Sequence, residues 1–320
     1  MKDGILVTAI GSFSGNAIID SLKRLKEYNV FGCDIYPAIW LPRSSEYLKV
    51  FKVPQVKKTE EYLSAVLSIC ESNKIRFIIP TTDIEIDVYN IFRETFKKRS
   101  ITLCISGNQT ISIARNKLKI STFFKDSAFK TIPTYKSINE MTGNLTFPYV
   151  AKLFNGRSSE GLMYIDNIEE LKLVFKKTDY IIQPFIPGDI YTVDYIRSSV
   201  FGTDYSFPRL ELLRTSNGAG ITVQLVHDQF LSESASMIGT KLDVNGSINF
   251  EFVKFKDEYF LMDINPRFSA GIAFTAKAGY DLVKSHLNCF TGKDIENPVD
   301  YPDMIIAKTY IETIMFVNKK

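Results

Sequence analysis

The amino-acid sequence predicts an α/β domain with a doubly wound parallel sheet over residues 1–112, followed by an α+β region that extends to residue 320. Two patterns predict this division. Short apolar runs alternate with helical spacing in the first part, and short strands joined by tight turns fill the second. The hydrophobic content of 45% and charged content of 23% are those of a globular protein, which excludes a disordered or collagen-like chain.

The first part of the chain contains four apolar runs typical of buried parallel strands, at residues 4–10, 30–34, 77–80 and 102–106. Helical spacing of apolar residues fills the intervals between them, at residues 18–25, 62–70 and 86–96. Strands that alternate with helices at this spacing indicate a parallel sheet with helices on its faces.

The second part of the chain is richer in strands, expected at residues 148–153, 162–165, 180–183, 191–197, 208–214, 221–226, 248–255 and 259–264. Helices are expected near residues 118–124 and 169–175. Because most of these strands follow one another after short turns, we expect antiparallel sheets and an α+β architecture.

Composition excludes several classes of function. The formal net charge of +3 is too small to favour nucleic acid as the main partner, and no apolar run approaches the roughly 18 residues of a membrane helix. The N-terminal apolar run is broken by glycines, so it predicts a first strand better than a signal peptide. The four cysteines lie far apart without a C-x-x-C pair, which is typical of reduced thiols in a cytoplasmic protein.

The glycine-containing turn at residues 11–15 lies where the first strand passes to a helix, a place where backbone N–H groups can hold an anion. A dinucleotide site would need G-x-G-x-x-G, but Phe13 and Asn16 stand at the second and third glycine positions. Asp34 stands where a ribose-binding carboxylate would, a weak signal by itself. The pattern favours a tight turn or part of a substrate pocket over a nicotinamide site.

A hairpin of two apolar strands contains the strongest chemical signal in the chain. The strands flank residues 256–258, and a three-residue loop there would pair Phe255 with Tyr259 and Glu251 with Asp263. The two acids would then lie opposite each other on neighbouring strands.

Asp263 and Asn265 are two residues apart on one strand, so their side chains share a face with Glu251. Oxygen ligands without His or Cys suit Mg²⁺, which shares its coordination shell with phosphates. Arg267 follows closely and supplies a fixed positive fork for a phosphoryl group. The alternative is a polar strand end in which Asn-Pro begins a turn, but it explains poorly why two acids, an amide and an arginine cluster there.

Three further segments predict a phosphate and nucleotide site. Lys152 ends a strand and precedes a small-residue loop at 155–161, where it can reach phosphate oxygens. The alternative is a lysine whose stem packs before a hairpin turn. Residues 183–188 (QPFIPG) contain two prolines and end another strand. Their exposed backbone groups could bind the edge of an adenine ring, and the alternative is an ordinary loop. Lys117, early in a helix, is a candidate phosphate contact or a solvated lysine.

Taken in order, these segments resemble the ATP-grasp superfamily, and look most like its carbamoyl-phosphate-synthase-like and pyrrolysine-biosynthesis-ligase-like branch. The motifs that carry the resemblance are I-I-P-T-T-D at 78–83, Q-P-F-I-P-G at 183–188, G-S-I-N-F-E at 246–251 and D-I-N-P-R at 263–267. The resemblance implies a Rossmann-like pre-ATP-grasp domain at 1–112 and two α+β subdomains, a small one at 113–185 and a large one at 186–320, that clamp the nucleotide.

The resemblance also implies roles for individual residues. ATP phosphates would be contacted by Lys117, Lys152 and a loop with Gly156, Ser158, Ser159 and Gly161. The adenosine would be held by Gln183, Pro184, Phe185, Ile186 and Asp189. One or two Mg²⁺ ions, replaceable by Mn²⁺, would be bound by Glu251, Asp263 and Asn265, and the transferred phosphoryl group would be steadied by Arg267 and Arg214.

Three positions depart from the family pattern. Residue 263 is Asp where the family usually has Glu, so its carboxylate is one methylene shorter. The carboxylate that holds the ribose falls at Ile190, which leaves Asp189 as its substitute. The phosphate loop contains Arg157 and Glu160 and is less glycine-rich than usual.

The resemblance implies a Mg-ATP-dependent ligase that activates a carboxylate as an acyl phosphate and joins it to an amine, releasing ADP and phosphate. The alternatives are a carbamoyl-phosphate-synthase-like enzyme that phosphorylates a small molecule, a non-catalytic ATP-binding protein and a dehydrogenase. The expected partners are small-molecule carboxylate and amine substrates, and the resemblance leans towards a homodimer.

Overall fold

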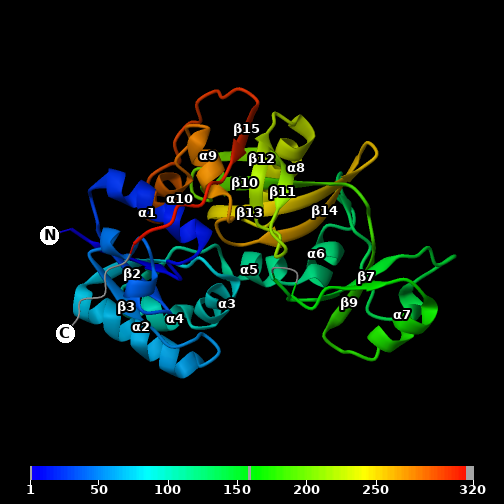
Figure 1. Cartoon of the computed structure of the whole chain (residues 1–320), viewed down its shortest axis with the longest axis horizontal. Coiled ribbons are helices and arrows are strands. Elements are labelled where there is room, and N and C mark those ends of the chain that lie inside the picture. The colour runs from blue at the N-terminus through cyan, green and yellow to red at the C-terminus, as the bar shows by residue number, and fades with distance from the viewer. Residues whose placement is uncertain (1, 158–159, 315–320) are drawn as a thin grey trace.

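Three β-sheets form the framework of the protein in the computed structural model, which describes residues 2–157 and 160–314 (Figure 1). A five-stranded sheet lies in the N-terminal part, a three-stranded sheet stands apart with one helix, and a seven-stranded sheet lies between them. Within the described residues, no helix has both the length and the apolar character needed to cross a membrane.

The five-stranded sheet is parallel throughout and has the order β3-β2-β1-β4-β5. Its strands are β1 Gly4–Thr8, β2 Asn29–Asp34, β3 Lys49–Lys52, β4 Ile75–Ile79 and β5 Thr102–Leu103. The doubly wound sheet expected from the sequence is therefore confirmed. Strand β3 was not expected, because its sequence KVFK has lysines at both ends and lies at a sheet edge where charge is tolerated.

Helices cover both faces of this sheet. They are α1 Phe13–Leu25, α2 Thr59–Asn73, α3 Asp83–Ile91, α4 Arg93–Lys97 and α5 Asn108–Ala114. Because side chains alternate along a strand, Ile5 and Val7 pack on the α1 side, whereas Leu6 packs on the side of α2 and α3. The single helix expected at residues 86–96 is two helices, which meet at Phe92.

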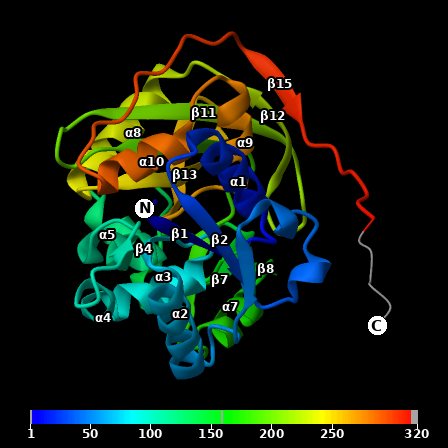
Figure 2. The same ribbon diagram turned by 90° about the vertical axis from the view of Figure 1, so that its left-hand side faces the viewer.

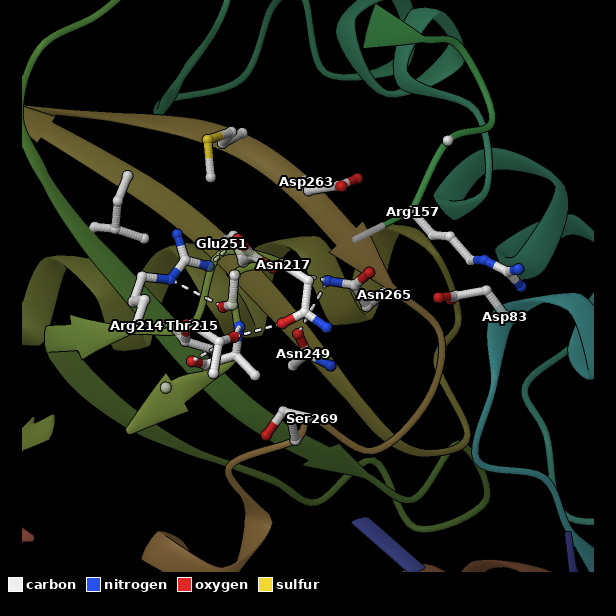
Figure 3. Close-up of a pocket in the computed structure, with 18 of the residues that line it drawn as sticks. Asp83, Arg157, Arg214, Thr215, Asn217, Asn249, Glu251, Asp263, Asn265 and Ser269 are labelled. Atoms are coloured by element: carbon white, nitrogen blue, oxygen red, sulfur yellow. Dashed lines mark hydrogen bonds and ion pairs between the residues drawn. The ribbon is translucent and has the colours of Figure 1, made fainter. Parts of the chain in front are cut away.

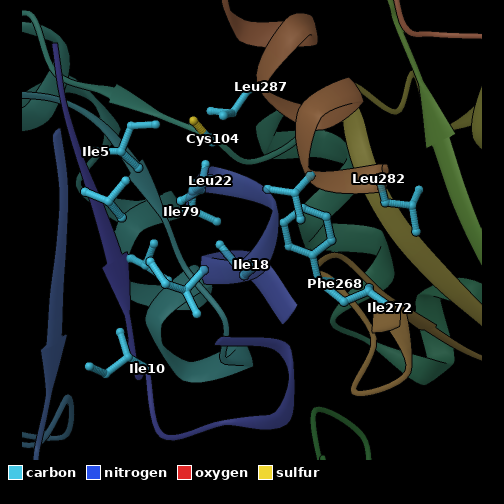
Figure 4. Close-up of a cluster of buried hydrophobic side chains, with 14 of the residues drawn as sticks. Ile5, Ile10, Ile18, Leu22, Ile79, Cys104, Phe268, Ile272, Leu282 and Leu287 are labelled. Carbon is cyan, nitrogen blue, oxygen red and sulfur yellow. The ribbon is translucent and has the colours of Figure 1, made fainter. Parts of the chain in front are cut away.

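The C-terminal part of the chain packs against α1. Helices α9 Ile272–Lys277 and α10 Leu282–Phe290 lie beside α1 in both views (Figures 1 and 2). Leu22 of α1 shares a buried cluster with Phe268, Leu282 and Leu287 (Figure 4). This apolar contact joins the N-terminal sheet to the end of the chain, since both contribute to one core.

The three-stranded antiparallel sheet has the order β8-β7-β9, with strands β7 Tyr149–Leu153, β8 Met163–Ile165 and β9 Tyr180–Pro184. Helix α7 Ile168–Val174 covers one face, where Leu171 and Val174 are buried against Tyr149 and Ile182. This unit carries the loop after Lys152 on its β7–β8 connection.

The seven-stranded sheet has the order β15-β12-β11-β10-β13-β14-β6 and is antiparallel except for β6 against β14. Its strands are β6 Lys130–Thr131, β10 Asp189–Arg197, β11 Asp204–Arg214, β12 Gly220–Leu225, β13 Gly246–Phe255, β14 Glu258–Asn265 and β15 Met304–Ala307. Helices α6 Lys117–Phe123 and α8 Gln229–Lys241 share an apolar core with one face. The boundaries placed at residues 112 and 185 stay predictions.

The β13–β14 hairpin has a shorter turn than expected. Lys254 pairs with Tyr259, so the predicted pairing of Phe255 with Tyr259 is wrong. The register shifts once beyond Phe252, however, and this bulge restores the predicted pairing of Glu251 with Asp263. The bulge therefore sets which acids face each other.

Candidate active site

A cavity of about 850 Å³ lies between the three sheets. The five-stranded sheet contributes residues 11–14 and 81–84 from loops after its strands, a position at which open α/β sheets commonly bind ligands. The three-stranded sheet contributes Lys152 and its loop, and the seven-stranded sheet contributes a polar face. Figure 3 shows side chains from β13 and β14 around this space. All three units therefore meet at one site.

Most of the residues proposed from the sequence line this cavity. Those that do are Lys117, Lys152, Gly156, Pro184, Phe185, Ile186, Arg214, Glu251, Asp263, Asn265 and Arg267. Gly161, Gln183 and Asp189 do not line it. Ser158 and Ser159 lie outside the described residues.

The local structure around Gly161, Gln183 and Asp189 explains why they do not line the cavity. Gln183 is buried and donates from Nε2 to Thr134 Oγ1 at 2.9 Å. Gly161 has a φ of +68° and belongs to a turn. Asp189 is exposed, whereas its neighbour Ile190 lines the cavity, because consecutive strand residues face opposite sides. The cavity lining therefore does not support the assignments of Gln183 to adenine and of Asp189 to ribose, which stay predictions.

The proposed metal ligands share one face of the β13–β14 hairpin. Glu251 pairs with Asp263 and Asn249 pairs with Asn265, so all four side chains come from facing positions. Asn265 Nδ2 donates to Glu251 Oε1 at 3.3 Å and to Asn249 Oδ1 at 3.1 Å (Figure 3). The hydrogen bonds hold Asn265 beside Glu251. Asn249 lies within the G-S-I-N-F-E motif but had no role assigned from the sequence.

Both carboxylates are ion-paired with cations that also line the cavity. Arg214 Nη2 lies 3.0 Å from Glu251 Oε2, and Lys117 Nζ lies 2.8 Å from Asp263 Oδ2. Lys117 Nζ also donates to the carbonyl oxygen of Gly156 at 3.2 Å. Lys117 therefore joins the hairpin to the loop that follows Lys152.

The Lys152 ammonium forms no hydrogen bond or ion pair with another described residue. Burial lowers its pKa, and the positive charge of Lys117 lowers it further, whereas Asp263 and Glu251 oppose the change. A half-buried cation that borders a cavity and has no partner among the described residues is stabilised by an anion. Lys152 is thus suited to bind a phosphate oxygen.

An apolar section of the cavity adjoins Lys152. Its walls come from β7, β10, β13, β14, the residue before β8 and the loop after β9, and consist of Val150, Leu162, Phe185, Ile190, Val253 and Met262. A region with apolar walls and nearby backbone groups suits a purine ring.

Arg267 lies on the side of the cavity that faces the N-terminal sheet. Its Nη2 lies 2.8 Å from Asp83 Oδ2 and 3.4 Å from Asn265 Oδ1. Arg115 Nη1 lies 3.7 Å from the second oxygen of Asp83. Burial alone would raise the pKa of Asp83, but the two guanidinium groups hold it below its usual range. The sequence carried no signal for Arg115, because its partners Asp83 and Asp87 lie on a different helix, far from it in the sequence.

The turn at residues 11–15 also borders the cavity, and its conformation is held by side chains. Gly11 N donates to Asp34 Oδ2 at 2.9 Å, and Gly15 N donates to Ser12 Oγ at 3.0 Å at the start of α1. Asp34 therefore stabilises the turn itself. This arrangement agrees with the interpretation of the segment as a tight turn, while its place in a substrate pocket stays a prediction.

Two family models match the chain in sequence order. Residues 5–104 match "PylC-like, N-terminal domain", and residues 176–313 match "ATP-grasp in the biosynthetic pathway with Ter operon". The second match confirms the expected resemblance to the ATP-grasp superfamily over residues 176–313. No relative among curated protein sequences matches it.

Solved structures confirm the ATP-grasp fold. A biotin carboxylase from Campylobacter jejuni superposes with a TM-score of 0.76 at 15% identity, over 93% of this chain and 72% of that one. An N5-carboxyaminoimidazole synthetase from Staphylococcus aureus, complexed with ADP, gives 0.73 at 16% identity, over 94% and 81%. An L-amino acid ligase from Bacillus licheniformis gives 0.68 at 12% identity, over 90% and 74%. At these identities the likeness establishes the fold.

ATP-grasp enzymes use ATP and Mg²⁺, and these are the cofactors of this chain. The residues present fit them. Within the described residues, no group of three or more His, Cys, Asp or Glu side chains could hold a metal by itself. Two carboxylates and an amide, at Glu251, Asp263 and Asn265, instead suit Mg²⁺, which completes its shell with phosphates and waters. Lys152, which has no partner among the described residues, suits the phosphates.

Proposed function

We propose that this ATP-grasp enzyme is an ADP-forming ligase that activates a carboxylate as an acyl phosphate and joins it to an amine. The observation that supports the proposal is the arrangement of Lys152, the Glu251–Asp263 pair and Arg267 around one cavity. Lys152 would bind phosphate, and the Glu251–Asp263 pair would hold Mg²⁺. Arg267 would lie where the phosphoryl group meets the acceptor. The cavity lining within the described residues contains neither Cys nor His, so a nucleophilic triad is not built there.

The first step brings two anions together. A carboxylate oxygen of the substrate attacks the γ-phosphorus of ATP, an O–P bond forms, and the bond to the bridging oxygen breaks to release ADP. Lys152 and Arg267 offset the repulsion and stabilise the charge on the transferred group. Bound Mg²⁺ supplies further charge neutralisation at the phosphate oxygens.

In the second step, the amine nitrogen attacks the acyl carbon and the C–O bond to phosphate breaks. An ammonium substrate loses two protons in total, one to solvent and one to the released phosphate. The product is an amide, and no covalent bond to the protein is formed.

The test incubates the protein with Mg-ATP and pooled amino and organic acids, and measures ADP, AMP and phosphate. We expect ADP and phosphate only when both a carboxylate and an amine are present, and loss of activity in Lys152→Ala. Lys119→Ala, an exposed lysine on the same helix as Lys117, is the control. AMP formation, or an active Lys152→Ala variant, contradicts the proposal.

The same assay separates the alternatives. Phosphate transfer without any amine indicates an enzyme that only phosphorylates a small molecule, as in carbamoyl-phosphate-type chemistry. Nucleotide binding without ADP formation in any pool indicates a non-catalytic ATP-binding protein.

A further inference from the structure

A buried charge cluster lies under the cavity on strands β10 and β11. Arg209 Nη1 lies 2.7 Å from Asp194 Oδ2, and Arg209 Nε lies 3.1 Å from Glu211 Oε1. Arg209 Nη2 donates to Ser269 Oγ at 3.1 Å. Its guanidinium therefore forms ion pairs with two carboxylates at once. The three charged residues together carry one net negative charge.

One carboxylate oxygen of this cluster borders the cavity and lacks a donor. The Glu211 side chain is only 2% exposed, and within the part of the chain that the structure describes its Oε2 has no hydrogen-bond partner. Glu211 lines the cavity, whereas Asp194 does not. A buried carboxylate oxygen without a donor costs free energy, so a ligand that supplies an N–H there gains affinity.

The nearest other cation does not fill this role. Lys308 Nζ donates to the carbonyl oxygens of Gly220 and Ala270, each at 2.9 Å. Burial lowers the pKa of Lys308 to about 8, with a further contribution from Arg209. Lys308 affects the charge of the region but donates no hydrogen bond to Glu211.

The wall beside Glu211 leaves room for a ligand. The cavity lining there consists of small residues at 218–220, 270 and 271. A Cβ atom at Gly220 would lie 2.2 Å from Glu211 Oε2, so a larger residue at position 220 would clash with that carboxylate. Strand β11 lies two strands from β13, which places Glu211 about 10 Å from the strand of Glu251. A separation of about 10 Å leaves space for a small acceptor substrate between Glu211 and the predicted phosphate site.

We propose that Glu211 binds the ammonium group of the amine substrate. The substrate class is thus a cationic primary amine, such as an amino acid or an alkylamine. An ammonium provides the missing N–H donor and balances the net negative charge of the cluster, whereas an anionic acceptor would be repelled. The inference rests on the proposed ligase function, whose amine it specifies.

The experiment measures thermal stabilisation of the full chain with Mg-ADP present. The probes are the standard amino acids and short alkylamines, each beside its N-acetyl derivative. We expect at least one amine to raise the Tm of the wild type while its N-acetyl derivative does not. In Glu211→Gln we expect the affinity for that amine to fall about tenfold or more, with the affinity for ADP unchanged. Glu258→Gln, an exposed glutamate at the start of β14, is the matched control.

A second variant, Gly220→Ala, keeps every charge but places a methyl group against Oε2 and displaces the carboxylate, so it should lose amine affinity in the same way. Unchanged ADP affinity shows that each variant is folded. Equal binding of amines and N-acetyl derivatives, full amine affinity in Glu211→Gln, or no stabilisation by any amine overturns the inference. If the wild type forms ADP with an amine whose affinity does not depend on Glu211, the ligase proposal stands and only the subsite is wrong.

Discussion

The carboxylate of Asp83, at the start of α3, lies 2.8 Å from the guanidinium of Arg267, which follows β14. The side chain of Asp83 is 3% exposed and that of Arg267 is 17% exposed. The ion pair joins the N-terminal sheet to the residue that we expect to contact the phosphoryl group. The orientation of Arg267 therefore depends on a residue from another unit.

Replacement of Asp83 by Asn should lower kcat for ADP formation by about tenfold to a hundredfold, because a small displacement of Arg267 misaligns it for transfer. The affinity for ATP should change little, since Lys152 is untouched. Steady-state kinetics with varied ATP separates the two effects. Asp87→Asn is the control, because Asp87 also binds Arg115 but is more exposed. Equal losses in the two variants would show that Arg115, and not Arg267, is responsible.

Lys117 is paired with Asp263, so a metal ion that binds Asp263 would compete with Lys117 for its carboxylate. Lys117→Met removes the cation that lies 2.8 Å from Asp263 Oδ2, so Mn²⁺ should bind more tightly in the absence of nucleotide. An ion pair of this kind is worth about 1 kcal/mol, which corresponds to an affinity change of roughly five- to tenfold. Electron paramagnetic resonance of free Mn²⁺ measures it. Lys119→Met, on the same helix, should leave the affinity unchanged, and an unchanged affinity in Lys117→Met would refute the competition.

The stability of the fold should fall below pH 6.5 because of His286. Its Nδ1 accepts a hydrogen bond from Ser247 N at 2.8 Å, and its Nε2 lies 3.1 Å from the carbonyl oxygen of Cys104. These contacts require a neutral ring, and burial lowers its pKa to about 4. Between about pH 6.5 and pH 4 the unfolded state binds more protons, so stability falls as pH falls, by about 3 kcal/mol in total.

Urea unfolding at neutral pH and near pH 4.5 tests this dependence. His286→Gln should be less stable at neutral pH but should lose less stability on acidification. His227→Gln, at an exposed position, should behave as the wild type. The assignment to His286 is wrong if both variants keep the full pH dependence.

Ile190 occupies the position at which the family has a ribose carboxylate, and it lines the cavity. Ile190→Glu should therefore tighten ATP binding, by about 1 kcal/mol for an added hydrogen bond from a ribose hydroxyl. Asp189→Ala should have no effect, because Asp189 lies outside the cavity lining. Isothermal titration with ADP compares the three proteins. Weaker binding in Ile190→Glu, or a loss in Asp189→Ala, would restore Asp189 as the ribose ligand.

The parts of the structure that the sequence predicted depend on local rules. Strand alternation and helical spacing predicted the parallel N-terminal sheet and the hairpin with Glu251 and Asp263, because side-chain period follows from backbone geometry. The D-I-N-P-R motif and Lys152 were likewise predicted to lie at one site, and Lys152, Asp263, Asn265 and Arg267 line one cavity. The hairpin shows the limit of such rules, since the correct pairing of the acids arose from a bulge that the sequence did not reveal.

Only the tertiary structure decided which distant groups meet. The pairs Asp83–Arg267 and Lys117–Asp263 join residues far apart in the sequence. Among the described residues, the Glu211 oxygen without a donor depends on how Arg209 is shared. The tertiary structure also decided that Gln183 lies outside the cavity lining, where it binds Thr134. These contacts arise from the packing of sheets against one another, and side-chain periodicity determines the face of a strand but not what that face meets.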